Sequence, residues 1–224
     1  MSHNISKHRL KHDEFAEDMA KTINLFRRYG TEILAVLVGA LIIVVGLFFV
    51  SQNRTKNERE ANLALGSAHA AMFSGDAQQA RQSYEEIIKR FGSTESAKEA
   101  MIYLGNMNFQ MRNQEEALKQ YQKAVQAKPK SYLLMAAAIS GVAACYEQSG
   151  DFNKAAEEYS RIAARYPKQS YLSVNALMAS GRCFRAAGND AKAREAYQTI
   201  ISKYSDDPGV QKAKAAMAML PPVG

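Results

Sequence analysis

Tryptophan is absent from this sequence of 224 residues, and cysteine, histidine and proline are rare, with two, four and five residues. Two cysteines in a chain of this length cannot form the disulfide framework of a small secreted domain. With only five prolines and 13 glycines, the chain is neither collagen-like nor a proline-rich low-complexity protein. Alanine, glutamate, lysine and glutamine dominate after the first fifty residues, and these residues favour helices. We therefore expect an all-α protein.

Motifs of known catalytic sites are also missing. The sequence has no HExxH, no GxSxG, no glycine-rich phosphate loop and no aspartate cluster with metal-ligand spacing. His69 is the only histidine after residue 50, and nothing marks a nucleophile beside it. His8 and His12 stand four residues apart but have no clear third ligand with which to hold a metal. We therefore expect a protein that is not an enzyme and that uses no cofactor and no metal.

Charge of one sign is only moderately in excess. The formal net charge is +7, from 29 basic and 22 acidic residues. Such an excess would suit nucleic acid or anionic lipid. However, the two signs alternate along the chain, and no block of five like charges occurs. This pattern favours a solvated surface of mixed charge, so we predict no nucleic-acid partner.

One long hydrophobic run, Ile33–Val50, carries no charged or strongly polar side chain. As a helix it would span roughly 27 Å, about the thickness of the hydrocarbon core of a bilayer. A core helix of a soluble protein would keep one polar face, and a cleaved signal peptide would have a shorter apolar part followed by small residues. We therefore predict a single transmembrane helix over residues 31–52.

The flanks of this run predict its orientation. Six basic residues precede the run and three follow it within ten residues, namely Lys7, Arg9, Lys11, Lys21, Arg27 and Arg28 before it and Arg54, Lys56 and Arg59 after it. Basic flanks tend to remain in the cytoplasm. We therefore expect residues 1–30 to be cytoplasmic and the remainder of the chain to be exported.

Residues 1–30 form the predicted cytosolic head. Asp13 is placed to cap a helix, and four apolar side chains follow on one helical face, at Phe15, Met19, Ile23 and Phe26. This pattern has two interpretations. The head is either an amphipathic helix that lies on the membrane or docks to a partner, or an extension of the anchor helix that is interrupted at Gly30.

The chain after the anchor repeats with a period near 38 residues. Breaks in the helical pattern occur at 74–76, 112–114, 149–151 and 188–190. Each break is followed by an alanine and, four residues later, a tyrosine, in the pairs Ala80/Tyr84, Ala117/Tyr121, Ala155/Tyr159 and Ala193/Tyr197. A helix–turn–helix unit that repeats in this way predicts an α-solenoid of four repeats. We expect a final helix, Pro208–Leu220, to close the solenoid, which gives a repeat domain over 53–220 and a tail over 221–224.

The motifs within these units resemble tetratricopeptide repeats. The residues that carry the resemblance are Leu104-Gly105, then Gly150-Asp151-Phe152 with Ala155, Tyr159 and Pro167, and then Gly188-Asn189 with Ala193 and Tyr197. The order of head, anchor and repeats is similar to the bacterial inner-membrane family that includes the ancillary subunit of the SecYEG translocon. That resemblance implies a periplasmic, chaperone-like role near the translocation machinery, with translocon subunits, periplasmic chaperones or client polypeptides as partners.

The concave face of such a solenoid is the predicted partner-binding surface, because the first helix of each repeat lines it in this fold family. The residues expected on it are Leu65, His69, Met72, Phe73, Ile102, Asn106, Phe109, Met178, Arg182 and Arg185, with Ser140, Ala144 and Glu147 between them. Exposed methionine and phenylalanine suit unfolded or amphipathic segments, since methionine repacks easily. The alternative is a register shifted by one residue, which would place some of these residues in the core.

Three functions remain open from the sequence. The first is a holding chaperone or scaffold for translocating chains, and the second is a scaffold for another envelope complex, in division, secretion or outer-membrane biogenesis. The third is a thiol-redox enzyme that uses Cys145 or Cys183, which occupy equivalent positions in repeats three and four. Packed helices stand about 8–10 Å apart, whereas a disulfide needs Cα atoms within about 7 Å, so two buried thiols are favoured.

Overall fold

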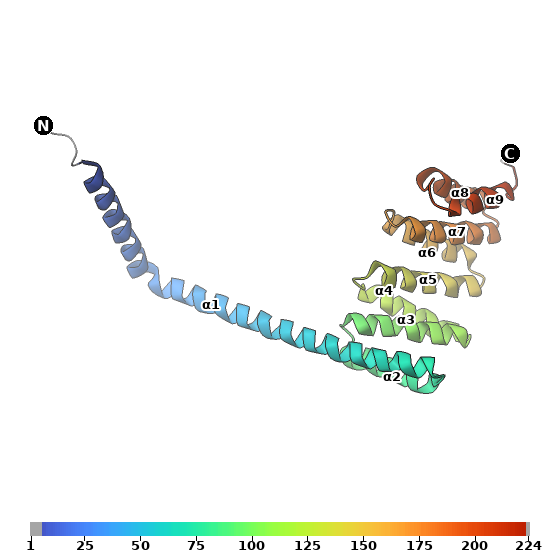
Figure 1. Cartoon of the computed structure of the whole chain (residues 1–224), viewed down its shortest axis with the longest axis horizontal. Helices are drawn as coiled ribbons and strands as arrows, with labels where there is room; N and C mark the ends of the chain where they lie inside the picture. Colours follow the sequence, from blue (N-terminus) through green and yellow to red (C-terminus); the bar gives the residue numbers. More distant parts are fainter. Residues whose placement is uncertain (1–5, 223–224) are drawn as a thin grey trace. The chain divides into compact units, whose positions relative to one another are not determined.

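The structure, a computed structural model, describes residues 6–222, and every regular element in that range is an α-helix (Figure 1). The helices are α1 (Ser6–Phe73), α2 (Ala77–Phe91), α3 (Glu95–Gln110), α4 (Gln114–Ala127), α5 (Tyr132–Gln148), α6 (Phe152–Arg165), α7 (Ser170–Ala186), α8 (Asp190–Lys203) and α9 (Gly209–Ala218). The chain divides into two compact units, Met1–Thr55 and Lys56–Gly224. The predicted all-α class is confirmed.

The described part of the first unit is a single stretch of α1. The predicted cap at Asp13 and the predicted interruption at Gly30 are both wrong, because α1 is helical through both residues. A glycine inside a helix costs only about 1 kcal/mol, which a long helix tolerates. Met19 and Ile23 are 50% and 53% exposed, whereas the side chains of Phe15 and Phe26 lie outside the described residues. The amphipathic face of the head stays a prediction.

The side chains of the apolar run of α1 are exposed in the part of the chain that the structure describes. Large side chains such as Leu37 and Phe49 are 60% and 67% exposed, and the most apolar stretch has no buried residue. Among the described residues, the segment Arg27–Phe73 of α1 is the one helical segment long and apolar enough to cross a membrane. The composition and exposure of this helix are thus those expected of a membrane span.

In the second unit the helices stack one on another in chain order (Figure 1). The last part of α1 pairs with α2, and the pairs α3–α4, α5–α6 and α7–α8 follow. The buried side chains form three clusters along the stack, centred on α1 to α3, on α3 to α5 and on α5 to α9. Each pair therefore shares its core with its neighbours, and the predicted four-repeat solenoid is confirmed.

In repeats two and four, the tyrosine of the second helix fills the space left by a glycine on a first helix. Tyr121 lies between α3 and α5, where a Cβ added to Gly105 or to Gly141 would approach its ring to 2.7 Å or 2.4 Å. Likewise, a Cβ added to Gly181 on α7 would lie 2.4 Å from the ring of Tyr197. Since real Cβ atoms do not make such contacts, glycine at these positions lets the helices approach closely.

The turns between paired helices follow the sequence signals. Gly75, Gly150 and Gly188 have φ of +86°, +83° and +73°, a conformation that glycine adopts without steric cost. Arg112 occupies the corresponding turn at φ +58°. At the end of the stack, α9 begins at Gly209 and not at Pro208, and its Val210 and Ala213 are buried against the last repeat.

Candidate protein-binding surfaces

The first helices of the repeats carry the predicted partner-binding residues, and these residues differ in exposure. Four of them are exposed, namely Phe73, Asn106, Arg182 and Arg185. Four others are partly buried, namely His69, Met72, Phe109 and Met178. Ser140, Ala144 and Glu147 are also partly buried. A mixed polar and apolar surface is therefore available on these helices.

Leu65 and Ile102 correct the predicted list. They are only 4% and 6% exposed and belong to two of the core clusters. A first helix packs against its own second helix on one side and against the next repeat on another, which leaves a narrow stripe free. Leu65 and Ile102 lie outside that stripe, so they offer no surface to a partner. Their burial agrees with the alternative interpretation, in which some of the predicted residues belong to the core.

A polar cluster joins the first helices of repeats three and four. Both terminal nitrogens of Arg182 on α7 donate to the carboxylate of Glu147 on α5, with Nη2 3.2 Å from Oε2. The hydroxyl of Tyr159 on α6 donates to the same carboxylate over 3.4 Å. Hydrogen bonds from Arg182 lower the pKa of Glu147, while burial raises the pKa of Tyr159 to about 12. At neutral pH the cluster thus holds an ionised carboxylate and a neutral phenol.

Repeat two contains a neutral counterpart of this cluster. The Tyr121 hydroxyl donates to Oδ1 of Asn106 over 2.6 Å, and burial raises the pKa of Tyr121. In both repeats a second-helix tyrosine thus reaches a polar residue on the first helix of its own repeat. Asn106 is exposed, so part of its amide remains available to a ligand.

Repeat one replaces these polar pairs with an aromatic cluster. The His69 ring lies 4.5 Å from the Tyr103 ring and 5.9 Å from the Tyr84 ring, measured between centroids, and the two tyrosine rings are stacked at 5.6 Å. Burial raises the pKa of Tyr84 to about 12. Nε2 of His69 and the hydroxyl of Tyr84 are buried with no hydrogen-bond partner among the described residues. The first helix of repeat one is therefore joined to its neighbours through aromatic rings, whereas the first helices of repeats three and four are joined through an ion pair.

Phe73 lies at the end of the first helix of repeat one, where it is 96% exposed beside the turn that contains Gly75. Met111, which follows the end of α3, is 55% exposed at the corresponding turn of repeat two. The sequence analysis predicted Phe73 but missed Met111. Its position next to Arg112, in a break of the helical pattern, was a signal that could have found it.

A groove of about 640 Å³ lies between the second helices α6 and α8. Leu177 and Phe184 of α7 form its floor, and the salt bridge between Lys192 and Glu157 crosses it at 3.9 Å. Lys192 also lies over the Phe184 ring, 5.2 Å from its centroid. Sequence analysis missed this groove because its width depends on the spacing of helices that are not adjacent in the chain.

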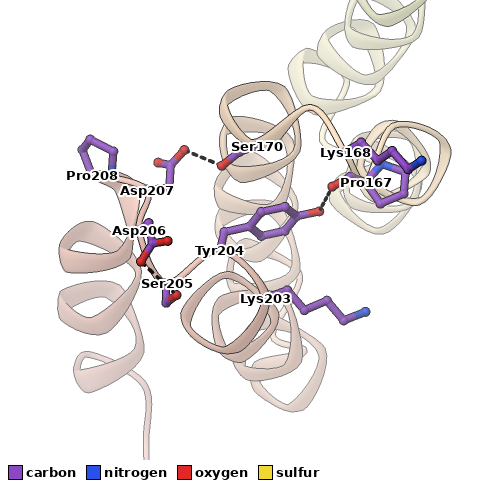
Figure 2. Close-up of a pocket in the computed structure, with 9 residues that line it drawn as sticks. All are labelled: Pro167, Lys168, Ser170, Lys203, Tyr204, Ser205, Asp206, Asp207 and Pro208. Atoms are coloured by element: carbon purple, nitrogen blue, oxygen red, sulfur yellow. Dashed lines mark hydrogen bonds between the residues drawn. The ribbon is translucent and has the colours of Figure 1, made fainter.

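A second cleft, of about 410 Å³, lies where the loop after α6 meets the loop after α8 (Figure 2). The Tyr204 hydroxyl donates to the carbonyl oxygen of Pro167 over 3.1 Å, and the Ser170 hydroxyl donates to Asp207 over 2.8 Å. In this view Lys168 and Lys203 lie on one side of the cleft and Asp207 on the other. The hydrogen bonds hold the two loops together and leave both lysines exposed.

The two cysteines are free thiols in the core. Cys145 and Cys183 are 3% and 0% exposed, and burial raises the pKa of each to about 11. A nucleophilic cysteine needs the opposite, an accessible thiol with a lowered pKa. Within residues 6–222, no group of three or more histidine, cysteine, aspartate or glutamate side chains is placed to hold a metal ion.

The sequence matches the tetratricopeptide repeat-like domain over residues 24–213, a range that contains both the apolar run and the repeats. The chain belongs to this tetratricopeptide repeat-like family. No curated protein matches the sequence. The family and the fold are those of a protein-interaction scaffold, and the predicted tetratricopeptide assignment is confirmed.

Solved structures share the fold at low sequence identity. A tetratricopeptide repeat protein from Parabacteroides merdae superimposes with a TM-score of 0.57 and 16% identity, over 71% of this chain and 59% of that chain. The MamA protein matches with a TM-score of 0.53 and 20% identity, over 72% and 79%. BtubC from P. vanneervenii superimposes with a TM-score of 0.56 and 17% identity, over 73% of this chain and 66% of that chain. This chain thus spans less than two thirds of the first of these proteins, and the likeness is one of fold.

Proposed function

We propose that this protein is a single-pass protein of the bacterial inner membrane, with its N-terminus in the cytoplasm and its tetratricopeptide solenoid in the periplasm. There it binds proteins, as a holding chaperone or scaffold associated with protein translocation and envelope folding. Its partners are translocon subunits, periplasmic chaperones or client polypeptides. It needs no cofactor.

The observation that carries the proposal is the exposed apolar run of α1 in the same chain as a protein-binding solenoid. A run such as Ile33–Val50, with large side chains about 60% exposed, is unstable in water and stable in hydrocarbon. The basic residues before the run outnumber those after it, which supports an exported solenoid. The proposed boundaries are 1–30 for the head, 31–52 for the span, 53–220 for the repeats and 221–224 for the tail.

The inner face of the solenoid supports protein binding. Exposed Phe73 and partly buried Met72, Phe109 and Met178 provide adaptable apolar contacts on the first helices. Arg185 is exposed and has no salt-bridge partner among the described residues, so it is free to meet a carboxylate. An apolar surface with such a cationic end suits extended or amphipathic polypeptides.

Protease accessibility tests the topology. In sealed inner-membrane vesicles of known sidedness and in spheroplasts, we expect the solenoid to be digested only from the periplasmic side. Carbonate washing should leave the full chain in the membrane. Digestion from the cytoplasmic side alone would disprove the proposed orientation and leave a cytosolic docking platform.

Site-specific photo-crosslinking tests the binding surface. A photoreactive residue at Met178 or Arg185 should capture periplasmic or translocon proteins in intact cells. The matched control is Gln122, an exposed residue on the second helix α4, which should capture few of them. Equal capture from all three positions would argue against a dedicated inner face.

The ion pair in repeats three and four favours a second candidate, a scaffold for another envelope complex in division, secretion or outer-membrane biogenesis. A fixed charge pair such as Arg182–Glu147 suits one partner better than many. A scaffold should lose a single partner when Phe109 or Arg182 is changed. A chaperone should bind many apolar clients and lose affinity for all of them when Phe109 is replaced by serine.

A further inference from the structure

The loops between successive repeats line up along one edge of the solenoid, which we call the junction edge (residues 92–94, 128–131, 166–169 and 204–208). Hydrogen bonds join neighbouring loops and helix starts along it. Glu58 of α1 accepts from the backbone N–H groups of Glu95 and Ser96, over 2.8 Å and 3.0 Å. Glu95 accepts from the backbone N–H of Lys130 over 2.8 Å. Hydrogen bonds thus link the first part of the junction edge from Glu58 to Lys130, and the bond from Tyr204 to Pro167 links its last two loops.

Exposed basic residues lie along this edge. They are Lys89, Lys128, Lys130, Arg165, Lys168 and Lys203, and none of them forms a salt bridge with the rest of residues 6–222. The acidic side chains Glu58, Glu95 and Asp207 are engaged in hydrogen bonds, and Asp206 is the exposed acidic residue in these loops. Basic residues in the last turn of a helix are explained by the helix dipole. Lys128, Lys130 and Lys168 lie in loops, so the dipole does not account for them.

Apolar and aromatic side chains are interspersed with these cations. Leu133 and Tyr171 occupy equivalent positions at the starts of α5 and α7, where they are 58% and 80% exposed. Tyr132 is 41% exposed, and its ring lies 6.0 Å from that of Tyr166 in the next loop. Lysine and arginine next to tyrosine and leucine are the combination that binds the interface of an anionic membrane.

The opposite edge, formed by the turns within the repeats, differs in charge. It also exposes apolar side chains, at Phe73 and Met111. Beside them lie the exposed acidic residues Asp76 and Glu115 and the exposed cation Arg112, whereas Lys154 and Lys192 at this edge form salt bridges with Asp151 and Glu157. A negatively charged lipid surface would therefore attract the junction edge, with its unpaired loop lysines, more strongly than this turn edge of mixed charge.

Glu58, where the junction edge begins, is close along the chain to the proposed membrane span. It lies only eight residues after Val50, the end of the apolar run. Eight residues reach at most about 28 Å even when fully extended. If the apolar run is embedded, as proposed above, Glu58 at the start of the junction edge therefore lies within that distance of the end of the span.

From these observations we infer that the junction edge is a second membrane contact, which lies on a surface of anionic phospholipid with Leu133 and Tyr171 at the interface. The lysines of the loops pair with lipid phosphates, and the Tyr and Leu side chains enter the headgroup region. This inference rests on the proposed anchoring by α1. The inferred contact would hold the solenoid against the membrane and would leave its inner face and turn edge accessible to protein partners.

Because the chain has no tryptophan, a single introduced tryptophan reports from one site only. We would reconstitute the full-length variants Tyr171→Trp and Phe73→Trp separately into vesicles rich in phosphatidylglycerol with brominated acyl chains. Phe73 is the matched control, since at 96% against 80% it is at least as exposed as Tyr171 but lies on the turn edge. We expect bromolipid to quench the tryptophan at position 171 and to shift its emission to shorter wavelength, and to leave the tryptophan at position 73 unaffected.

Charge removal provides a second measurement on the same reporter. Neutralising Lys128 and Lys168 by Lys→Gln changes in the Tyr171→Trp chain should lower the equilibrium constant for the membrane-bound state about fivefold for each charge. The matched control is the pair Lys154→Gln and Lys192→Gln at the turn edge, which should change nothing. In vesicles of phosphatidylcholine alone, the Tyr171→Trp chain should show the same loss of tryptophan quenching as the variant with Lys128 and Lys168 changed to glutamine.

The outcomes separate this inference from the anchoring. If the chain resists carbonate extraction but the tryptophan at position 171 is unquenched, or both positions are quenched alike, the inferred contact is wrong and the anchor stands. An unquenched junction edge would then be a surface for an acidic protein. If carbonate removes the chain from the vesicles, the anchoring itself is wrong, and the tethered contact fails with it.

Discussion

The guanidinium of Arg182 on α7 and the carboxylate of Glu147 on α5 form a two-point ion pair between the first helices of repeats three and four. The two residues are 35 positions apart and belong to successive repeats. Arg182 is the principal cause of the lowered pKa of Glu147. The pair therefore links repeats three and four. It also engages Arg182, one of the two exposed arginines of α7, so that this cation is less available to a partner than Arg185.

The first prediction concerns the pH dependence of this pair. A carboxyl group whose pKa is lower in the folded state stabilises the fold above its unfolded pKa, and this contribution disappears as the pH falls through the folded pKa. Glu147→Gln should therefore lower the free energy of unfolding by about 0.5–1 kcal/mol at pH 7, since the pair is partly exposed. Urea unfolding should show this difference shrinking as the pH falls below about 4.5. A difference that grows in acid would contradict the assigned pairing.

The second prediction concerns the close approach of α7 and α8. Gly181→Ala would place a Cβ 2.4 Å from the buried ring of Tyr197, and such overpacking costs about 1–3 kcal/mol. The control is Gly66→Ala in α1, where the new Cβ would meet no atom within 4 Å beyond the adjacent residues and the backbone of its own helix. That change should stabilise the fold by about 0.5–1 kcal/mol through helix propensity. Thermal unfolding of the two variants should therefore shift in opposite directions.

The third prediction compares two tyrosine hydroxyls. Tyr121→Phe removes the hydrogen bond to Asn106 and should lower the free energy of unfolding by about 0.5–1.5 kcal/mol. Tyr84→Phe removes a buried hydroxyl that has no partner among the described residues, so it should cost nothing and should stabilise the fold by up to about 3 kcal/mol. Chemical denaturation measures both. A loss of stability in Tyr84→Phe would mean that an ordered water or another group satisfies this hydroxyl.

The fourth prediction concerns thiol reactivity. With pKa values near 11, against a usual value of 9.0, Cys145 and Cys183 carry roughly 100-fold less thiolate than free cysteine. Burial restricts access further, so a disulfide reagent at pH 8 should modify the folded chain at least about 100-fold more slowly than the chain in urea. Rapid modification of one thiol in the folded state would revive the thiol-redox hypothesis. A Cys145→Ser, Cys183→Ser double variant with full binding activity would dismiss it.

The repeats were predictable from sequence because their signals are local and recur. The pair Ala117 and Tyr121, like its three equivalents, marks the side of the second helix that faces the first helix. Each of the four tyrosines contacts a residue on the first helix of its own repeat. The glycine turns were predictable for the same reason, since Gly75, Gly150 and Gly188 need positive φ. The head was less predictable, because a cap residue such as Asp13 or a glycine such as Gly30 has only a small effect inside a long helix.

The binding surfaces were only partly predictable. Counting between repeats selected Asn106, Arg182 and Arg185, which are exposed on the first helices, together with Leu65 and Ile102, which are buried there. Their role in binding stays a prediction. One helical position decides whether a side chain faces the next repeat or the open face. The junction edge escaped sequence analysis altogether, since it gathers residues that are about 38 positions apart and that show no common motif.

The ties along the junction edge also bear on how the chain folds. Glu58 meets Glu95 and Ser96 at separations of 37 and 38 residues, Glu95 meets Lys130 at 35, and Pro167 meets Tyr204 at 37. No stage of folding has to close a loop much longer than one repeat, and short loops close quickly and at low entropic cost. A chain that emerges with its N-terminus first can therefore complete each repeat as soon as the next one follows, without waiting for its C-terminal end.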